Sequence, residues 1–327
     1  MGSKQGRKQP DALSPRSTNS FTPNEQASLG RSAMTRRPGF YSLIFIAIVA
    51  VSFGAILIRL ADDAPILTIA TWRLVVSFIL LAPLALRRRA TAAMSHRDRL
   101  LSILSGVFLA LHFILWISSL SYTSVASSVV LVSTNPIFVG LGSRFLLKER
   151  FSRSLALAIL LSVSGGFLIG WGDIRIGGEA LYGDLLALGG AVMASAYYLL
   201  GRRVRQHAPL SGYIFLSYGT AAVLLLAVCL ALRQPLTGFS NTTYLYLVLL
   251  AVGPQLIGHS TFNWALKYVS ASTVAILILG EPICATLFAY LILGEGLTLL
   301  KGIGAMIILI GIYLSLHEEE VANERGL

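Results

Sequence analysis

The chain contains two related stretches, TNPIFVGLGSRFLLKERFS at residues 134–152 and GEPICATLFAYLILGEGLT at residues 280–298. An offset of 146 superimposes them and also aligns identical residues on either side. The aligned pairs are Leu120 with Leu266, Tyr122 with Tyr268, Ser124 with Ser270, Pro136 with Pro282, Leu147 with Leu293, Glu149 with Glu295 and Gly165 with Gly311. An offset of 144 aligns Arg59 with Arg203 and Ala64-Pro65 with Ala208-Pro209. The duplication therefore spans nearly the whole hydrophobic part of the chain.

The composition places that hydrophobic part in a membrane. Of the 327 residues, 55% are hydrophobic and 13% are charged, with a mean hydropathy of +0.74, whereas soluble domains carry about 25% charged residues. A helix needs about 20 mostly apolar residues to cross the hydrocarbon core. The predicted spans are residues 40–60, 64–86, 100–120, 124–147, 154–171, 181–201, 210–232, 244–265, 271–293 and 299–316.

These spans divide into two sets of five that follow the duplication. Because five is an odd number of crossings, the second copy enters the membrane from the opposite side. The sequence therefore predicts an all-α integral membrane protein with ten transmembrane helices in two inverted five-helix repeats. The predicted organisation is a disordered cytoplasmic tail at 1–39, repeats at 40–171 and 181–316, and a cytoplasmic tail at 317–327.

The formal charge of +11 comes from Lys and Arg residues that gather in the leading tail and in short loops. They are not spread over one face, which argues against nucleic acid as a partner. Basic residues of short loops stay on the cytoplasmic side, and here most of them share the side of the amino terminus. We therefore predict a multi-pass protein of the bacterial inner membrane with both termini in the cytoplasm.

Inverted repeats are a recurring design of secondary transporters, because two such halves can open alternately to either side around a shared site. Ionisable groups at membrane depth are costly and usually face a cavity or a partner. Glu281 directly precedes Pro282 in the ninth predicted helix, and Arg73 lies midway along the second. Glu281 is a candidate for an amine or a proton, and Arg73 for a carboxylate. A structural alternative remains for each: a protonated acid bonded to a carbonyl, and a guanidinium paired between helices.

Other polar residues repeat at helical spacing. Gln255, His259 and Asn263 share one face of the eighth predicted helix, and His112, Trp116 and Ser119 share one face of the third. Ser128 and Asn135 share a face of the fourth. All are candidate lining residues, although single polar residues often only join helices. Tyr197 and Tyr198 are interpreted as membrane-interface residues, and the glycines at 165–170, 189–190 and 302–304 as sites of close helix packing.

The sequence contains no Walker loop, no Gly-x-Ser-x-Gly elbow, no His-Glu-x-x-His and no Cys-x-x-Cys motif, so it indicates no cofactor, metal or hydrolytic activity. Cys229 and Cys284 lie in different apolar helices and are expected to be buried free thiols. The alternative from another class is an intramembrane enzyme that acts on lipid-linked substrates, with Glu281 as base and a histidine as acid. A receptor is disfavoured, since the loops are short.

The stretch Gly280-Glu281-Pro282-Ile283, its counterpart Thr134-Asn135-Pro136-Ile137, and residues 183–188 (GDLLAL) resemble the drug/metabolite transporter superfamily, specifically its EamA-like ten-helix members and among them YddG-type amino-acid exporters. The resemblance covers roughly residues 40–316. It implies a basket of ten helices, a central cavity between the halves, peripheral fifth and tenth helices, and efflux of amino acids or related metabolites. The two halves differ in that Asn135 stands where the second has Glu281.

The sequence therefore predicts a secondary transporter, not an enzyme, that exports amino acids or related small amphipathic metabolites by alternating access, with a proton as a further candidate partner. The predicted substrate-binding residues are Arg73, His112, Trp116, Ser128, Asn135, Gln255, His259, Asn263 and Glu281.

Overall fold

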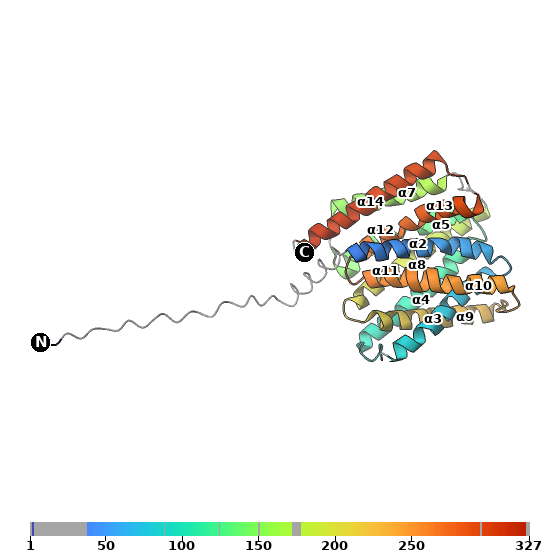
Figure 1. Cartoon of the computed structure of the whole chain (residues 1–327), viewed down its shortest axis with the longest axis horizontal. Coiled ribbons are helices and arrows are strands. Elements are labelled where there is room, and N and C mark those ends of the chain that lie inside the picture. Colours follow the sequence, from blue (N-terminus) through green and yellow to red (C-terminus); the bar gives the residue numbers. More distant parts are fainter. Residues whose placement is uncertain are drawn as a thin grey trace.

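A computed structural model of the chain describes Gly2 and residues 38–87, 89–123, 125–149, 151–171, 178–294 and 296–324. These residues form a bundle of helices (Figure 1). The elements of the first half are α2 (Pro38–Leu60), α3 (Ile66–Arg87), α4 (His96–Ser119), α5 (Val125–Val132), α6 (Asn135–Gly142), the π-helix η1 (Ser143–Leu147) and α7 (Arg153–Gly170). Those of the second half are α8 (Glu179–Arg205), α9 (Leu210–Ala231), α10 (Asn241–Leu250), the π-helix η3 (Ala251–His259), α11 (Ser260–Ala265), α12 (Ala271–Ile278), α13 (Gly280–Leu293) and α14 (Leu299–Glu324).

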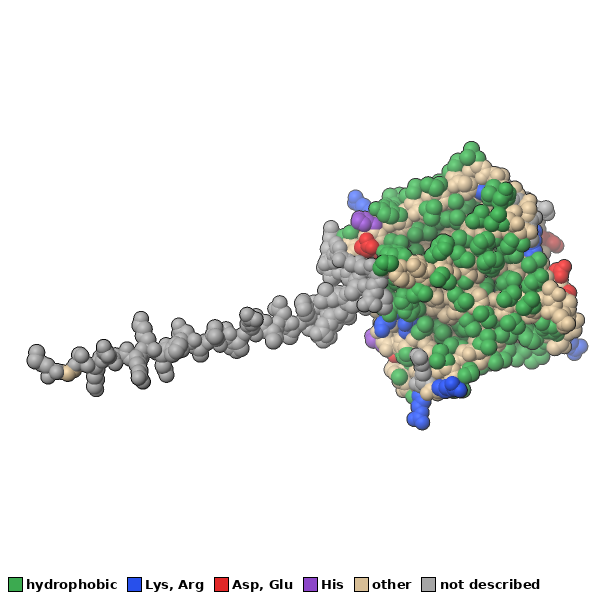
Figure 2. All heavy atoms as spheres, in the orientation of Figure 1, with side chains coloured by type: hydrophobic (Ala, Val, Ile, Leu, Met, Phe, Trp, Pro, Cys, Tyr) green, Lys and Arg blue, Asp and Glu red, His purple; other side chains and the backbone are tan. Residues whose placement is uncertain are grey.

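The lengths and composition of these helices confirm a multi-pass membrane protein. Within the described ranges, nine helical segments are long and apolar enough to cross a membrane, and the shorter apolar helix Arg153–Ile169 stands at the place of the remaining predicted span. The visible side of the bundle is mostly hydrophobic, while charged and histidine side chains gather at its two ends (Figure 2). The start of α2 and the end of α14 lie at the same end of the bundle (Figure 1), which we call the terminal end.

Two spans predicted as continuous helices are broken at equivalent positions. In the fourth span, α5 ends at Val132 and α6 begins at Asn135. In the ninth span, α12 ends at Ile278 and α13 begins at Gly280. Each restart precedes a proline, Pro136 or Pro282, which lacks an N–H and clashes with the preceding turn. The eighth span widens into the π-helix η3 around Pro254 for a related reason. Hydropathy alone does not register such breaks.

The last helix is longer than predicted. α14 continues to Glu324, past the expected end at residue 316. Its added turns carry polar contacts to the rest of the bundle: the Tyr41 hydroxyl donates to Glu320 Oε1 at 2.8 Å, and Glu319 accepts from the backbone N–H of Ser270 at 3.0 Å. These contacts stabilise a segment that has no hydrophobic signal of its own.

α7 and α14 pack against each other along one edge of the bundle (Figure 1), as the resemblance implied for the fifth and tenth helices. Gly165 and Gly304 stand at the crossing. A Cβ atom on either one would lie 2.6 Å from the backbone carbonyl oxygen of the other. The expected role in close packing is thereby confirmed for Gly165 and Gly304, whereas the same expectation is wrong for Gly302, where a Cβ would meet open space.

We expect Gly165→Ala and Gly304→Ala to destabilise the protein by roughly 1–3 kcal/mol, the usual cost of overpacking, despite the better helix propensity of alanine. Thermal unfolding in detergent measures the effect. Gly302→Ala is the matched control, because a Cβ there meets no atom within 4 Å. Equal melting temperatures for all three variants would contradict the packing argument.

The loop between α2 and α3 caps a helix of the other half. The Asp63 carboxylate accepts from the backbone N–H of Ser240 at 2.8 Å and from the Thr243 hydroxyl, and so closes the N-terminus of α10. The backbone bond from Ser240 and the Thr243 hydroxyl together lower the pKa of Asp63 below its usual range. An anion at a helix N-terminus also interacts favourably with the positive end of the helix dipole.

Because the pKa of Asp63 is lower in the folded protein, its stabilising contribution is complete above the unfolded value of about 3.9 and is lost as pH falls through the folded value. We expect Asp63→Asn to melt at a lower temperature than wild type near neutral pH. The difference should shrink in acid, as melting curves between about pH 3 and 7 would show. Asp62→Asn, one residue away, is the control; a difference that stays constant with pH would refute the assignment.

Candidate functional site

Arg73 is a buried cation midway along the bundle. Its side chain is 5% exposed midway along α3. Nε donates to Gln255 Oε1 of η3 at 2.8 Å, and the guanidinium carbon lies 4.8 Å from the ring centre of Phe113 on α4. The terminal Nη groups form no hydrogen bond or ion pair with the described residues. The guanidinium is thus held through Nε, while the edge formed by Nη1 and Nη2 stays available for a bidentate contact.

Glu281 stands in the first turn of α13, directly after the break in the ninth span. The Ser52 hydroxyl of α2 donates to its backbone carbonyl at 3.1 Å. Its carboxylate forms no hydrogen bond and no ion pair within 4.0 Å in the described part of the chain, yet it is close enough to Arg73 for mutual electrostatic attraction. The Arg73 guanidinium and the Glu281 carboxyl group, which belong to different halves, therefore interact without a direct ion pair.

The predicted polar stripe of the eighth span points inward, as expected. Gln255 and Asn263 are fully buried, and His259 is half-buried. The Asn263 amide donates to the hydroxyls of Tyr197 and Tyr218 and to the His259 carbonyl at 2.8 Å. Arg73, Gln255, His259, Asn263 and Glu281 are called the polar cluster below.

The interpretation of Tyr197 and Tyr198 as interface residues is wrong. They are only 1% and 3% exposed, and the Tyr198 hydroxyl lies 3.4 Å from His259 Nδ1. α8 packs against α4, α6 and α11, so neither ring reaches lipid. One signal in the sequence was Tyr218, which lies away from the ends of α9, because a tyrosine there needs a polar partner within the bundle.

His112 and Trp116 form an aromatic wall on α4. His112 Nδ1 lies 2.9 Å from the Gly190 carbonyl, and the two rings are parallel within 7°, with centres 5.8 Å apart. Gly190 permits this approach, because a Cβ there would lie 3.2 Å from the backbone and Cβ of Trp116. Phe113, between them in sequence, contacts both Arg73 and His259, so this wall adjoins the polar cluster.

The remaining predicted residues make their hydrogen bonds outside the polar cluster. The Ser128 hydroxyl pairs with Ser119 at 2.6 Å, which joins α5 to α4. The Asn135 carbonyl accepts from Ser195 of α8 at 3.1 Å. The break at Thr134 lies between Ser128 and Asn135, and both residues are buried.

Three polar atoms of the predicted residues are buried without a hydrogen-bond partner among the described residues. They are Gln255 Nε2, Trp116 Nε1 and Asn263 Oδ1. Buried polar atoms are nearly always paired in native structures. Together with the two Nη groups of Arg73, these two donors and one acceptor are available to bind a ligand. A few such polar groups are typical of a small-molecule site.

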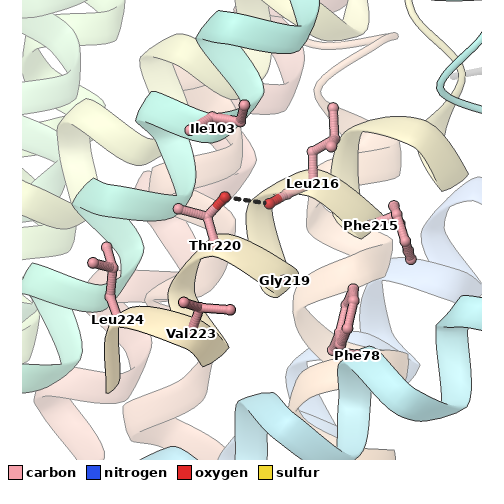
Figure 3. Close-up of a pocket in the computed structure, with 8 residues that line it drawn as sticks. All are labelled: Phe78, Ile103, Phe215, Leu216, Gly219, Thr220, Val223 and Leu224. Carbon is pink, nitrogen blue, oxygen red and sulfur yellow. Dashed lines mark hydrogen bonds between the residues drawn. The ribbon is translucent and has the colours of Figure 1, made fainter. Parts of the chain in front are cut away.

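Two of the hollows on the surface of the described bundle lie beside the interior helices. One, of about 380 Å³, is lined by Phe78, Phe215, Leu216 and their neighbours, and the Thr220 hydroxyl there bonds back to the Leu216 carbonyl (Figure 3). Its apolar lining matches a lipid-facing groove. A second hollow, of about 270 Å³ between α2, α9 and α11, reaches Ser260. The Ser260 hydroxyl bonds Tyr218 and the Gln255 carbonyl, so this hollow touches the polar network.

Comparison with known proteins agrees with this architecture. The chain is 28% identical over 216 residues to an uncharacterized transporter of Clostridium kluyveri, covering 63% of this chain and 68% of that one. It is 24% identical over 296 residues to a probable amino-acid metabolite efflux pump of Salmonella typhimurium, covering 86% and 95%. Human solute carrier family 35 member G1 is 23% identical over 262 residues, covering 76% and 70%.

A crystal structure superimposes with a TM-score of 0.73 at 20% identity, covering 86% of this chain and 98% of the other, which shows a shared fold. The named relatives are transporters rather than enzymes. Residues 39–171 and residues 181–317 each match the EamA-like transporter family, and the chain belongs to this family of the drug/metabolite transporter superfamily.

Proposed function

We propose that this transporter exports amino acids or related small amphipathic metabolites across the bacterial inner membrane by alternating access, and that the polar cluster binds the substrate. The observation that supports this most directly is the separation of Arg73 from Glu281. A zwitterion placed between them offers a carboxylate to the guanidinium and an amine to the carboxylate. Both protein charges then gain a partner without a direct salt bridge.

The geometry of Arg73 favours a carboxylate in particular. Gln255 accepts only from Nε, so Nη1 and Nη2 can donate to the two oxygens of one carboxylate. Gln255 Nε2 supplies a further unpaired donor beside it. The flat surfaces of Phe113 and Trp116 adjoin this polar end and suit an apolar side chain. An amphipathic solute satisfies both surfaces at once.

The two halves contribute unequally to the proposed site. Arg73, His112 and Trp116 come from residues 40–171, and Gln255, His259, Asn263 and Glu281 come from residues 181–316. We propose that these two ranges act as inverted repeats that rock about this shared site. Ser128 and Asn135 then support the broken helix of the first repeat rather than touching the substrate.

Amino acids are also the solute class suggested by the name of the Salmonella typhimurium relative. The intramembrane enzyme that the sequence left open has no support among the relatives, which are named as transporters. The basic residues of the terminal end, including Arg87, Arg97 and Arg203, favour a cytoplasmic position for both termini. Glu281 and the two histidines of the site are the candidates for proton coupling.

The test is counterflow of radiolabelled leucine and phenylalanine in proteoliposomes, with analogues that lack either the carboxylate or the amine as competitors. We expect wild type to favour intact amino acids over both analogue classes. Arg73→Gln should reduce the preference for solutes with a carboxylate over analogues without one, and Glu281→Gln should reduce the preference for solutes with an amine. Each preference should fall on the order of 10- to 100-fold, the value of a hydrogen bond to a charged group.

Thr220→Val, in the apolar outer groove, is the control and should transport like wild type. An imposed pH gradient separates a proton antiporter from a uniporter in the same vesicles. Exchange of a different solute class with no response to any amino acid would refute the proposed substrate. If Arg73→Gln and Glu281→Gln weakened competition by every analogue equally, these residues would not bind the two charged groups of the substrate.

A further inference from the structure

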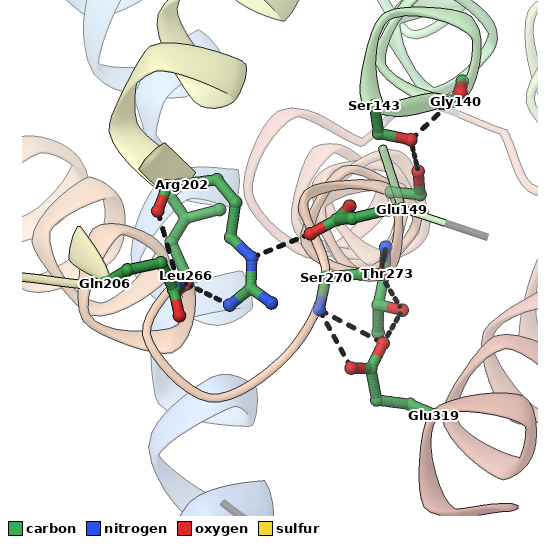
Figure 4. Close-up of polar contacts among 10 residues, drawn as sticks. Gly140, Ser143, Glu149, Arg202, Gln206, Leu266, Ser270, Thr273 and Glu319 are labelled. Atoms are coloured by element: carbon green, nitrogen blue, oxygen red, sulfur yellow. Dashed lines mark hydrogen bonds and ion pairs between the residues drawn. The ribbon is translucent and has the colours of Figure 1, made fainter. Parts of the chain in front are cut away.

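A buried ion pair joins the two halves at the terminal end. Arg202, near the end of α8, donates from Nε to Oε1 of Glu149, which follows η1, at 2.9 Å (Figure 4). The side chains are 10% and 20% exposed. Arg202 Nη1 also donates to the Leu266 carbonyl at 2.6 Å, so one guanidinium ties the first half to the loop after α11.

Both partners are held in place by their surroundings. The backbone N–H of Glu149 donates to the Ser143 carbonyl at 3.1 Å, which fixes the turn after η1. Beside the pair, Glu319 of α14 accepts from the Ser270 N–H and the Thr273 hydroxyl and thereby anchors the start of α12 (Figure 4). The pair therefore joins rigid elements and is not a contact between flexible surface side chains.

The position of Arg202 relates this pair to the polar cluster. Tyr198 precedes Arg202 by four residues on α8, so both lie on the same helix face, and Tyr198 contacts His259. Leu266 lies on the terminal side of His259 along the facing segment of the chain. The ion pair thus stands between the polar cluster and the solvent at the terminal end.

We propose that the Glu149–Arg202 pair is the latch that closes the substrate chamber at the terminal end, and that opening this end requires the pair to separate. The inference rests on the proposed function, since a latch needs a chamber to close. Burial raises the pKa of Glu149 above its usual range, against the opposing effect of Arg202. The closed arrangement is therefore one in which each charge depends on the other.

This dependence predicts how the latch responds to mutation. Removing one partner of a buried ion pair leaves an uncompensated charge, whereas replacing both partners is far less costly. In Glu149→Gln the closed form holds Arg202 without a counterion, while the open form hydrates it. The single variant therefore shifts the population toward the form that is open at the terminal end, and Arg202→Gln does the same by stranding Glu149.

The experiment measures thiol accessibility and needs no substrate. A cysteine replaces His259 in a Cys284→Ser background, and a charged, membrane-impermeant maleimide is added to vesicles from the terminal side and, separately, from the opposite side. We expect Glu149→Gln and Arg202→Gln to accelerate labelling at position 259 from the terminal side by about tenfold or more. The double variant should label more slowly than either single variant.

Two internal controls accompany this measurement. Native Cys229 is fully buried beside the Thr71 hydroxyl, so its labelling, read separately by mass spectrometry, reports unfolding rather than gating. Lys148→Gln removes an exposed charge next to Glu149 and should label like the parent.

The outcomes separate the latch from the proposed function. If position 259 reacts in the parent but the single variants do not change its rate, or the double variant is as fast as the singles, the latch is refuted and the chamber stands. If position 259 reacts from neither side in any variant while Cys229 stays protected, no chamber reaches it, and the proposed function fails together with the latch.

Discussion

The interior guanidinium of Arg73 is the constraint on which the arrangement of the bundle depends. A charge at membrane depth needs polar partners, and Arg73 obtains them from separate elements. Gln255 Oε1 accepts from its Nε, the Phe113 ring lies 4.8 Å from its guanidinium carbon, and the Glu281 carboxyl group is close enough to interact electrostatically. Gln255 and Glu281 belong to the second half of the chain, so solvation of this one cation requires the halves to meet at mid-membrane. In the proposed function, the Nη1 and Nη2 atoms of this guanidinium are where the substrate carboxylate binds.

The sequence carried enough information for the fold at the level of spans and repeats. Apolar length predicted the spans, and the recurrence of Pro136 as Pro282 predicted the duplication. The inward direction of Gln255, His259 and Asn263 followed from their spacing, which survives the π-helix because all three lie on the side of the span that packs against other helices. The structure also places these residues with Arg73, which spacing along single helices does not predict.

The features that the sequence did not predict depend on tertiary surroundings. Tyr197 and Tyr198 match an interface position along α8, and only the helices packed around α8 reveal that they are interior. Ser128 and Asn135 lie on either side of the break at Thr134, which the spacing along a single regular helix did not predict. Glu149 and Arg202 are 53 positions apart and carry no joint pattern, so their pairing is visible only once η1 and α8 are placed side by side.

The interruptions at Thr134 and Leu279 have a mechanical consequence. Bending an intact transmembrane helix sacrifices backbone hydrogen bonds that lipid cannot replace. At these two points the regular ladder is already interrupted, so each half possesses a built-in joint whose flexing breaks little further bonding. Glu281 lies in the first turn of α13, directly after the interruption at Leu279. A small rotation of α13 at this point would move the Glu281 carboxyl group within the interior while the flanking helices keep their places in the bilayer.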